Sequence, residues 1–150
     1  MSKGSKILLI DDDKTLLETL KLALEEEGYT VDIAQNGKEA IAKSNSNFYN
    51  LAIVDWRLPD VEGTKLLGQL KETTPKMSKI MLTGYPSMNN AIDAVNKQAD
   101  AFLLKPVDFK VLLDKIEELL KQQVKAKKYT EDMVANFIET RVKQLTTGSA

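Results

Sequence analysis

The sequence predicts an α/β fold: a doubly wound, five-stranded parallel sheet with helices on both faces. Two observations support this prediction. Short apolar runs alternate along the chain with longer segments whose apolar residues recur at helical spacing. Within the short runs apolar residues are continuous instead of alternating with polar ones, which is typical of parallel strands that are buried on both faces. Strands and helices that alternate in this way form an open parallel sheet.

Five β–α units are expected. The predicted strands are the apolar runs Lys6–Ile10, Leu51–Val54, Lys79–Leu82 and Ala101–Leu104, together with the β-rich segment Tyr29–Ala34. The predicted helices, several of them marked at one end by glycine or proline, are Lys14–Glu27, Lys38–Ser44, Thr64–Glu72, Pro86–Gln98 and a long amphipathic helix from Asp108. Right-handed crossover connections leave few topologies for such a sheet. Among them we expect the strand order 2-1-3-4-5, the flavodoxin-like arrangement.

The composition excludes several kinds of site. The chain has no cysteine and no histidine, so disulfides, zinc–thiolate sites, imidazole metal sites and serine–histidine–aspartate triads are excluded. Any metal must therefore be a hard cation held by oxygen, meaning Mg²⁺, with Mn²⁺ or Ca²⁺ as substitutes. The net charge of −1 and the shortness of the apolar runs favour neither nucleic acid nor a membrane as a partner of this chain, and the cytoplasm is the expected location.

Charged and hydroxyl side chains stand where the predicted strands end. In chain order these are Asp11 and Asp12, Asp55, Thr83 and Lys105. The carboxyl ends of parallel strands form one rim of the sheet, where such proteins bind ligands. Taken singly, each of these residues is typical of a turn or a cap, as we expect of Asp13 at the start of the first helix. Three carboxylates at one rim, however, repel one another unless a cation neutralises them, so we expect Mg²⁺ there.

This set of groups suits phosphoryl transfer to a carboxylate. A carboxylate can attack phosphorus and form an aspartyl-phosphate, and Asp55 is the candidate nucleophile. The reaction otherwise needs positioning and neutralisation of the phosphoryl oxygens. Mg²⁺ on Asp12 and Asp55, the Lys105 ammonium and the Thr83 hydroxyl would provide both. Because the chain has no histidine, a phosphohistidine donor would have to come from a partner.

Four segments resemble the motifs of the receiver domain of two-component response regulators. They are Ile7–Asp13, similar to the first strand and acidic pair; Ala52–Gly63, similar to the phosphorylation strand and its loop; Ile80–Tyr85; and Ala101–Pro106. The resemblance covers about residues 5–122, which we expect to form one domain. Each motif is weak alone, but four in this order and at these separations are specific to the family.

The resemblance implies a role for each matching residue. Asp55 would be the phosphoacceptor. Asp11 and Asp12 would be the acidic pair that holds Mg²⁺, with Asp12 as the more direct ligand. The backbone carbonyl of Arg57 would complete the protein's share of the metal coordination, and Lys105 would pair with the phosphoryl group.

The resemblance also implies a switch. Thr83 would move toward the phosphoryl oxygens, and Phe102 stands where the family keeps a switching aromatic residue, although plain core packing explains it equally well. A cis peptide bond is expected before Pro106. Phosphorylation would then change the 4-5-5 face, which consists of the predicted helix Ser87–Gln98, the strand Ala101–Leu104 and the helix from Asp108.

The expected function is therefore a signalling switch in a phosphorelay. A histidine kinase or phosphotransfer protein would phosphorylate the chain in trans, and the 4-5-5 face would control a downstream effector. The chain would not be an enzyme beyond catalysing its own phosphorylation and a slow autodephosphorylation.

Three alternatives fit less well. A phosphohydrolase of the haloacid dehalogenase type would have a second aspartate two residues after the nucleophile, where this chain has Arg57. A degenerate interaction module would have lost an acidic or lysine position, and a flavin-binding relative would have a hydroxyl-rich phosphate loop after the first strand.

Residues 123–146, beyond the resemblance, are expected to form a helical extension or linker. Thr130-Glu131-Asp132 is typical of a helix start, and apolar residues then recur at helical spacing: Met133, Val134, Phe137, Ile138, Val142 and Leu145. Such a helix would lie on the domain or on a second copy, or would begin a coiled coil toward an output module. A homodimer through this helix or through the 4-5-5 face is one arrangement that the sequence allows. Residues 1–4 and 147–150 are expected to be disordered.

Overall fold

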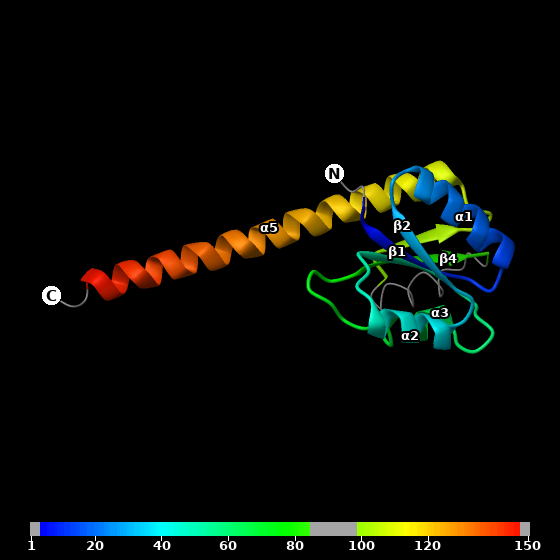
Figure 1. The fold of residues 1–150 in the computed structure, drawn as a ribbon, viewed down its shortest axis with the longest axis horizontal. Coiled ribbons are helices and arrows are strands. Elements are labelled where there is room, and N and C mark those ends of the chain that lie inside the picture. The colour runs from blue at the N-terminus through cyan, green and yellow to red at the C-terminus, as the bar shows by residue number, and fades with distance from the viewer. Residues whose placement is uncertain (1–3, 85–98, 148–150) are drawn as a thin grey trace.

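The computed structural model describes residues 4–84 and 99–147. Its centre is a parallel sheet (Figure 1). Five strands lie in it in the order β2-β1-β3-β4-β5, as predicted. The strands are β1 (Lys6–Ile10), β2 (Thr30–Ala34), β3 (Leu51–Asp55), β4 (Ser78–Thr83) and β5 (Ala101–Leu104). The fold class and the strand order are both confirmed.

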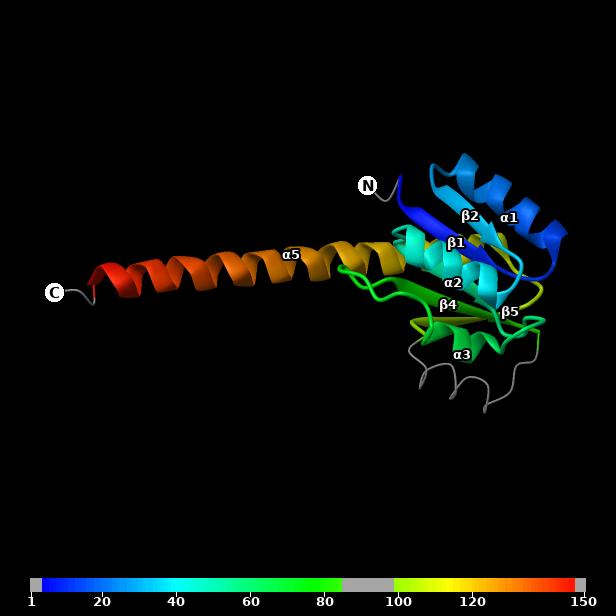
Figure 2. The same ribbon diagram turned by 60° about the horizontal axis from the view of Figure 1, so that its bottom comes forward.

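Helices cover both faces of the sheet. The described helices are α1 (Lys14–Glu26), α2 (Gly37–Ser46), α3 (Gly63–Leu67) and α5 (Phe109–Thr147). The helices α1 and α5 lie over one face, and α2 and α3 lie over the other (Figure 2). The helix predicted from Pro86 to Gln98 lies outside the described residues. The label α4 is therefore not used, and the helix after β5 is labelled α5.

The apolar strand residues form two cores, one on each face of the sheet. Successive side chains of a strand point to opposite faces, so Ile7 and Leu9 of β1 join the core under α1 and α5, whereas Leu8 and Ile10 join the core under α2 and α3. All four are at most 2% exposed. Burial on both faces explains why β1 and β3 read as continuous apolar runs.

The strand register brings the predicted site residues to one rim. Ile10, which precedes Asp11, pairs with Val54, and Asp55 pairs with Leu82. Across the next pair of strands, Thr83 lies opposite Leu104, directly before Lys105. The ends of four strands thus deliver their polar residues to the same place.

The short helix α3 differs from its prediction. It begins at Gly63 and ends at Leu67, whereas the sequence predicted a helix from Thr64 to Glu72. Gly68 is the C-cap, and glycine is unfavourable in a helix interior because it loses more backbone freedom than other residues. The buried Lys79 extends its ammonium to the carbonyl of Leu67, 2.7 Å away, and so binds the end of this helix.

The C-terminal helix is longer than predicted. The predicted start of a separate helix at Thr130 is wrong, because α5 runs without a break through this position and the Thr130 hydroxyl donates to the carbonyl of Ala126 in the preceding turn. The segment from 107 to 147 contains neither glycine nor proline, so the helix has no residue that would end it.

Residues 124–145 of α5, called the arm below, project away from the sheet (Figure 1). Leu119 and Leu120 are still buried, but Val124 is 64% exposed and Phe137 67% exposed. The arm therefore does not lie on its own domain, which was one of the predicted placements.

Hydrogen bonds fix α5 to the domain where the arm begins. The Gln123 side-chain amide donates to the backbone carbonyls of Asn50 and Lys76, at 2.9 and 2.8 Å. These two residues precede β3 and β4, so the first part of α5 is bound to the amino ends of two strands. In the described residues, no helix is both long enough and apolar enough to cross a membrane.

Candidate functional site

Three carboxylates meet at the carboxyl rim of the sheet. Asp11 follows β1 and is 4% exposed, Asp55 ends β3 and is 7% exposed, and Asp12 is exposed beside them. One carboxylate oxygen from each lies within 4.8 Å of the others. The three acids that the sequence predicted as a metal site are thus brought together, and below they are called the acidic pocket.

Lys105 supplies a cation to this pocket. Its ammonium lies 2.7 Å from Asp11 Oδ2 and 3.0 Å from Asp55 Oδ1, and its side chain is 24% exposed. The Lys105–Pro106 peptide bond is cis, as the resemblance implied. One ammonium therefore faces three carboxylates, and the pocket keeps an excess of negative formal charge.

The two oxygens of Asp11 have different partners. Oδ1 accepts the backbone N–H of Asp13 at 2.9 Å, and Oδ2 accepts the Lys105 ammonium. Asp13 itself accepts the N–H of Leu16 with its side chain and caps α1, as predicted. Asp11 is therefore held in place from both sides, whereas Asp12 faces solvent.

The surroundings alter the proton affinities of these groups. Burial raises the pKa of the Asp55 carboxyl above its ordinary value and the Asp11 carboxylate raises it further, while Lys105 opposes the rise. Burial acts to lower the pKa of the Lys105 ammonium, but its hydrogen bonds to Asp11 and Asp55 outweigh this, and the pKa lies above its ordinary value. The lysine accordingly stays charged and partly neutralises the pocket.

Of the remaining predicted residues, Thr83 lies at the rim, whereas Phe102 pairs with Met81 further back along the strands. Thr83 is fully buried at the end of β4, and its backbone carbonyl accepts the N–H of Lys105 at 2.7 Å. Arg57 is exposed in the loop of residues 56–62 between β3 and α3, called the β3–α3 loop below. Phe102 is half-buried in β5 and packs against the core under α2 and α3. Neither the metal-binding role of the Arg57 carbonyl nor the switching role of Phe102 follows from these positions, and both stay predictions.

The comparisons with known proteins agree with this geometry. The family model described as "Response regulator receiver domain" matches residues 7–117. The chain belongs to this family. Among solved structures, the receiver resembles a CheY-like receiver domain protein from Methanospirillum hungatei JF-1 with a TM-score of 0.78 and 45% identity, covering 83% of this chain and 99% of that one. A two-component response regulator from Clostridium difficile has a TM-score of 0.75 and 34% identity, with 79% and 97% covered.

Curated relatives are longer than this chain. The Escherichia coli K12 transcriptional regulatory protein GlrR is 36% identical over 139 residues, which are 93% of this chain and 31% of GlrR. The response regulator ArlR of Staphylococcus saprophyticus is 33% identical over 121 residues, 79% of this chain and 54% of ArlR. The match to GlrR is longer than the family-model match and continues into the arm, so the receiver shares part of α5 beyond residue 117 with that relative.

Two site features of the receiver were not predicted from the sequence. Asp60 and Gly63 were noted only as parts of a motif, yet Asp60 binds the start of α2 and Gly63 contacts the backbone of the phosphoacceptor candidate, Asp55. The turn residues Leu58-Pro59-Asp60 indicate a tight loop. Nothing in this short segment, however, indicates that the Asp60 side chain will cap a helix whose first residues lie 22 and 23 positions earlier in the sequence.

Gly63 should be a sensitive position. A Cβ placed on it would lie 2.1 Å from the backbone carbonyl oxygen of Asp55. Relieving this clash would require one of the two backbone segments to move, which costs free energy. We expect Gly63→Ala to lower the free energy of unfolding by about 1–3 kcal/mol, the usual cost of overpacking. Urea unfolding measures this. Gly68→Ala is the matched control, because its nearest contact is the carbonyl of Lys65 at an ordinary 3.8 Å; equal stability of the two variants would contradict the steric explanation.

Proposed function

We propose that this receiver takes a phosphoryl group from a phosphohistidine of a partner kinase or phosphotransfer protein onto Asp55. The proposal rests mainly on one observation: a nearly buried carboxylate at the sheet rim lies against the Lys105 ammonium and within reach of two further carboxylates. An oxygen of Asp55 would form a bond to phosphorus while the bond between phosphorus and the donor nitrogen breaks, and the imidazole leaves with that electron pair. The sequence has no histidine of its own to serve as donor.

The donor set of the acidic pocket fits Mg²⁺. Hard divalent cations prefer oxygen ligands, and the pocket offers carboxylate oxygens from three residues within 4.8 Å of one another. Asp12 and Asp55 would be direct ligands, with the Arg57 carbonyl as a third. Asp11 is the less direct ligand, since both its oxygens already accept hydrogen bonds. Bound Mg²⁺ would supply neutralisation of charge on the transferring phosphoryl group.

The other residues would stabilise the phosphorylated form. The Lys105 ammonium already contacts Asp55 Oδ1 and would remain close to the new phosphoryl oxygens. The Thr83 hydroxyl, at the end of the neighbouring strand, would donate to one of them. The receiver would act on no substrate other than the phosphodonor and would only catalyse its own phosphorylation and slow dephosphorylation.

Intact mass spectrometry tests the proposal. The receiver is incubated with Mg²⁺ and acetyl phosphate, a small phosphodonor, and should gain the mass of one phosphoryl group. Asp55→Asn should gain none, because the amide is not a nucleophile toward phosphorus. Omitting Mg²⁺ should slow the reaction of the parent strongly. A folded parent that stays unmodified, or an equal gain in the variant, would overturn the proposal.

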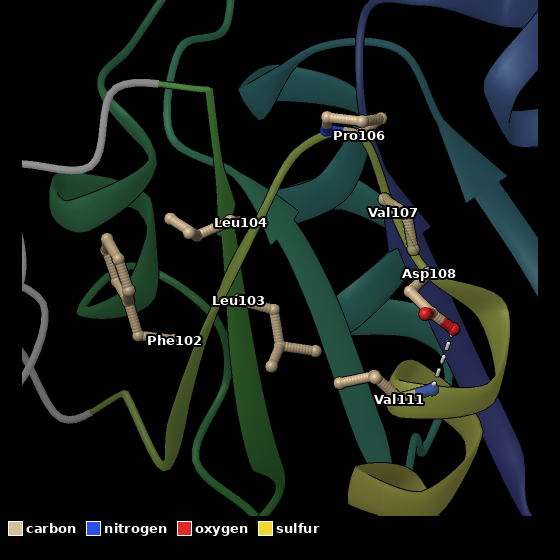
Figure 3. A pocket seen from close by; sticks show the side chains of 7 residues that line it. All are labelled: Phe102, Leu103, Leu104, Pro106, Val107, Asp108 and Val111. Atoms are coloured by element: carbon tan, nitrogen blue, oxygen red, sulfur yellow. Dashed lines mark hydrogen bonds between the residues drawn. The ribbon is translucent and has the colours of Figure 1, made fainter.

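We propose further that the described part of the 4-5-5 face binds the downstream effector. A pocket of about 330 Å³ lies between β5 and the start of α5 (Figure 3), lined by Phe102, Leu103, Leu104, Pro106, Val107, Asp108 and Val111. Leu104 and Val111 are about half exposed there. Because Lys105 lies between Leu104 and Pro106, a change at the phosphorylated pocket would be passed on to this face directly through the backbone. The predicted helix Ser87–Gln98 of this face lies outside the described residues.

The arm, we propose, pairs with the arm of a second copy. Three buried residues of α5, Leu112, Ile116 and Leu119, begin a series with alternating spacing of four and three. The series passes through Gln123, which is hydrogen-bonded to the domain. It continues along the arm without a charged residue: Ala126, Thr130, Met133, Phe137, Thr140 and Gln144. Spacing of this kind is typical of the seam of a coiled coil. An uncharged seam allows two arms to pair without repulsion, and in a parallel pair each residue would meet its own copy.

Oligomeric state as a function of concentration tests the pairing. The parent should show a monomer–dimer equilibrium in analytical ultracentrifugation. Phe137→Glu should be monomeric, because two carboxylates would meet in the seam. Ala135→Glu, which introduces the same charge about 200° around the helix, is the control and should dimerise like the parent. A parent that is monomeric at every concentration would contradict the pairing.

The cytoplasmic location stays a prediction.

A further inference from the structure

Asp60 connects the β3–α3 loop to a helix on the same side of the sheet. Its Oδ1 accepts the backbone N–H of Gly37 at 2.8 Å, and its Oδ2 accepts the N–H of Lys38 at 2.9 Å. These are the first two residues of α2. Asp60 is thus separated from its partners by more than twenty residues in the sequence and holds them with both carboxylate oxygens.

The two N–H groups belong to a helix end that has two separate caps. The Asn36 side chain accepts the N–H of Glu39 at 2.8 Å, which is the ordinary N-cap interaction. Gly37 and Lys38 lie in the first turn, whose N–H groups have no acceptor within the helix, and they are left to Asp60. The partial positive charge of a helix N-terminus also favours a carboxylate. In agreement, the hydrogen bonds from Gly37 and Lys38 hold the pKa of the Asp60 carboxyl below its ordinary value.

The β3–α3 loop is a small hairpin with Asp60 near its tip. The backbones of Arg57 and Glu62 form an isolated antiparallel bridge, and the N–H of Leu58 donates to the carbonyl of Val61 at 3.3 Å. Movement at Asp60 would therefore be passed on to Arg57 through only two residues of a tight turn. Arg57 is the residue whose carbonyl faces the metal in the proposed function.

Close contacts support the hairpin at both ends. A Cβ on Gly37 would lie 2.3 Å from Val61 Cγ1, so the loop lies directly against the start of α2. At the other end, the N–H of Gly63 donates to the carbonyl of Trp56 at 2.8 Å, and Gly63 contacts the carbonyl of Asp55. The loop therefore has two attachments: one at the phosphoacceptor, and one at α2, where Val61 packs against Gly37 and the Asp60 carboxylate accepts the hydrogen bonds of Gly37 and Lys38.

We propose that Asp60 is a positioning residue, which ties the β3–α3 loop to α2 so that the Arg57 carbonyl is held over the acidic pocket. Below, this connection is called the Asp60 strap. The inference rests on the proposed Mg²⁺ site. Asp60 would not contact the metal itself but would raise the affinity for Mg²⁺ by holding the loop in its binding geometry before the ion arrives.

Metal affinity is the first readout. Trp56 is the only tryptophan and directly follows Asp55, so its fluorescence should change when Mg²⁺ binds. Asp60→Ala should raise the dissociation constant for Mg²⁺ roughly tenfold, as expected when a group that orients a metal ligand is lost. Asp60→Asn should raise it less, because the amide keeps one acceptor oxygen.

Asn36→Ala is the matched control. It removes the other cap of α2, at Glu39, but leaves the β3–α3 loop untouched. If Asp60 only stabilised α2, both alanine variants would weaken Mg²⁺ binding alike. The strap predicts that Asn36→Ala destabilises the protein in urea yet binds Mg²⁺ with the affinity of the parent.

Two further measurements distinguish a positioning role of Asp60 from a general loss of structure in the variant. Phosphorylation of Asp60→Ala by acetyl phosphate should be slow at low Mg²⁺ and approach the parental rate at saturating Mg²⁺, since only the affinity is altered. In metal-free protein, hydrogen exchange of the Leu58 amide should accelerate in Asp60→Ala but not in Asn36→Ala.

The outcomes distinguish the strap from the function on which it rests. A parent that shows no Mg²⁺ binding would overturn the proposed metal site. A parent that binds Mg²⁺ with the same affinity as Asp60→Ala would overturn the strap alone, as would equal losses of affinity in Asp60→Ala and Asn36→Ala. A maximal phosphorylation rate that stays low at saturating Mg²⁺ would also overturn it.

Discussion

Replacing Asp55 by Asn should stabilise the metal-free receiver by about 1–2 kcal/mol, although it removes the proposed phosphoacceptor. Asp55 is nearly buried, and one of its oxygens lies within 4.8 Å of an oxygen on each of two other carboxylates. Two like unit charges at such a distance repel by about 3 kcal/mol at an effective dielectric constant of about 20. The Lys105 ammonium offsets part of this repulsion, and the remainder is the expected gain.

Urea unfolding in EDTA at neutral pH measures the effect. Adding Mg²⁺ should reduce or reverse the difference, because Mg²⁺ stabilises the parent by binding to its folded state. Asp114→Asn is the control: it removes one negative charge from an exposed position of α5 and should change stability by less than about 0.5 kcal/mol. A metal-free Asp55→Asn that is no more stable than the parent would mean that Lys105 neutralises the pocket completely.

The same variant should reveal the sign of the pH dependence. Because the pKa of Asp55 is raised in the folded state, the folded protein holds this proton more tightly than the unfolded chain does. The parent therefore loses stability as the pH rises through the raised pKa. The advantage of Asp55→Asn should be absent below the ordinary pKa of 3.8 and appear above it. An advantage that is constant with pH would show that charge repulsion is not its cause.

Replacing Lys105 by Met should have the opposite effect and destabilise the metal-free receiver by about 3 kcal/mol. Methionine has a similar length but no charge, so Asp11 and Asp55 would both lose the ammonium that now lies 2.7 and 3.0 Å away. Leaving buried charges without their partner typically costs about 3–5 kcal/mol. The partial exposure of Lys105 places the expected loss at the lower end.

Mg²⁺ should restore much of this loss. Without the ammonium, the pocket holds three carboxylates with no neighbouring cation of their own, so the gain in stability on adding Mg²⁺ should be larger in Lys105→Met than in the parent. The control is Lys115→Met, which breaks an exposed pair with Glu118 on α5 and should cost less than about 1 kcal/mol. Equal losses in the two variants, or an equal response to Mg²⁺, would contradict a neutralising role for Lys105.

The acidic pocket was predictable because its residues obey a rule of topology. Each follows or ends an apolar strand, and parallel strands end at one rim, so Asp11, Asp55 and Lys105 could be assigned to one place from the sequence. The same reasoning placed Thr83 at this rim and Asp13 in a cap, and the structure agrees. Here a local pattern and the global fold indicate the same answer.

Predictions that depended on local chemistry alone were less accurate. Thr130 and the acidic residues after it have the composition of a helix start, but such a cap is useful only where a preceding helix has ended, and nothing ends α5 there. Conversely, α3 stops at Leu67 although its apolar pattern continues to Leu70. Apolar periodicity shows which face is buried but does not determine how many residues remain helical.

The sequence by itself determined the class of fold, the order of the strands and which residues stand at the rim, because these follow from apolar patterns that repeat along the chain. Only the tertiary structure decided which groups touch. Lys105 meets Asp11 across 94 residues and Asp60 caps a helix 23 residues before it. Contacts of this kind depend on strand register and on the packing of side chains, to within a fraction of an ångström, and no short segment of the sequence encodes those distances.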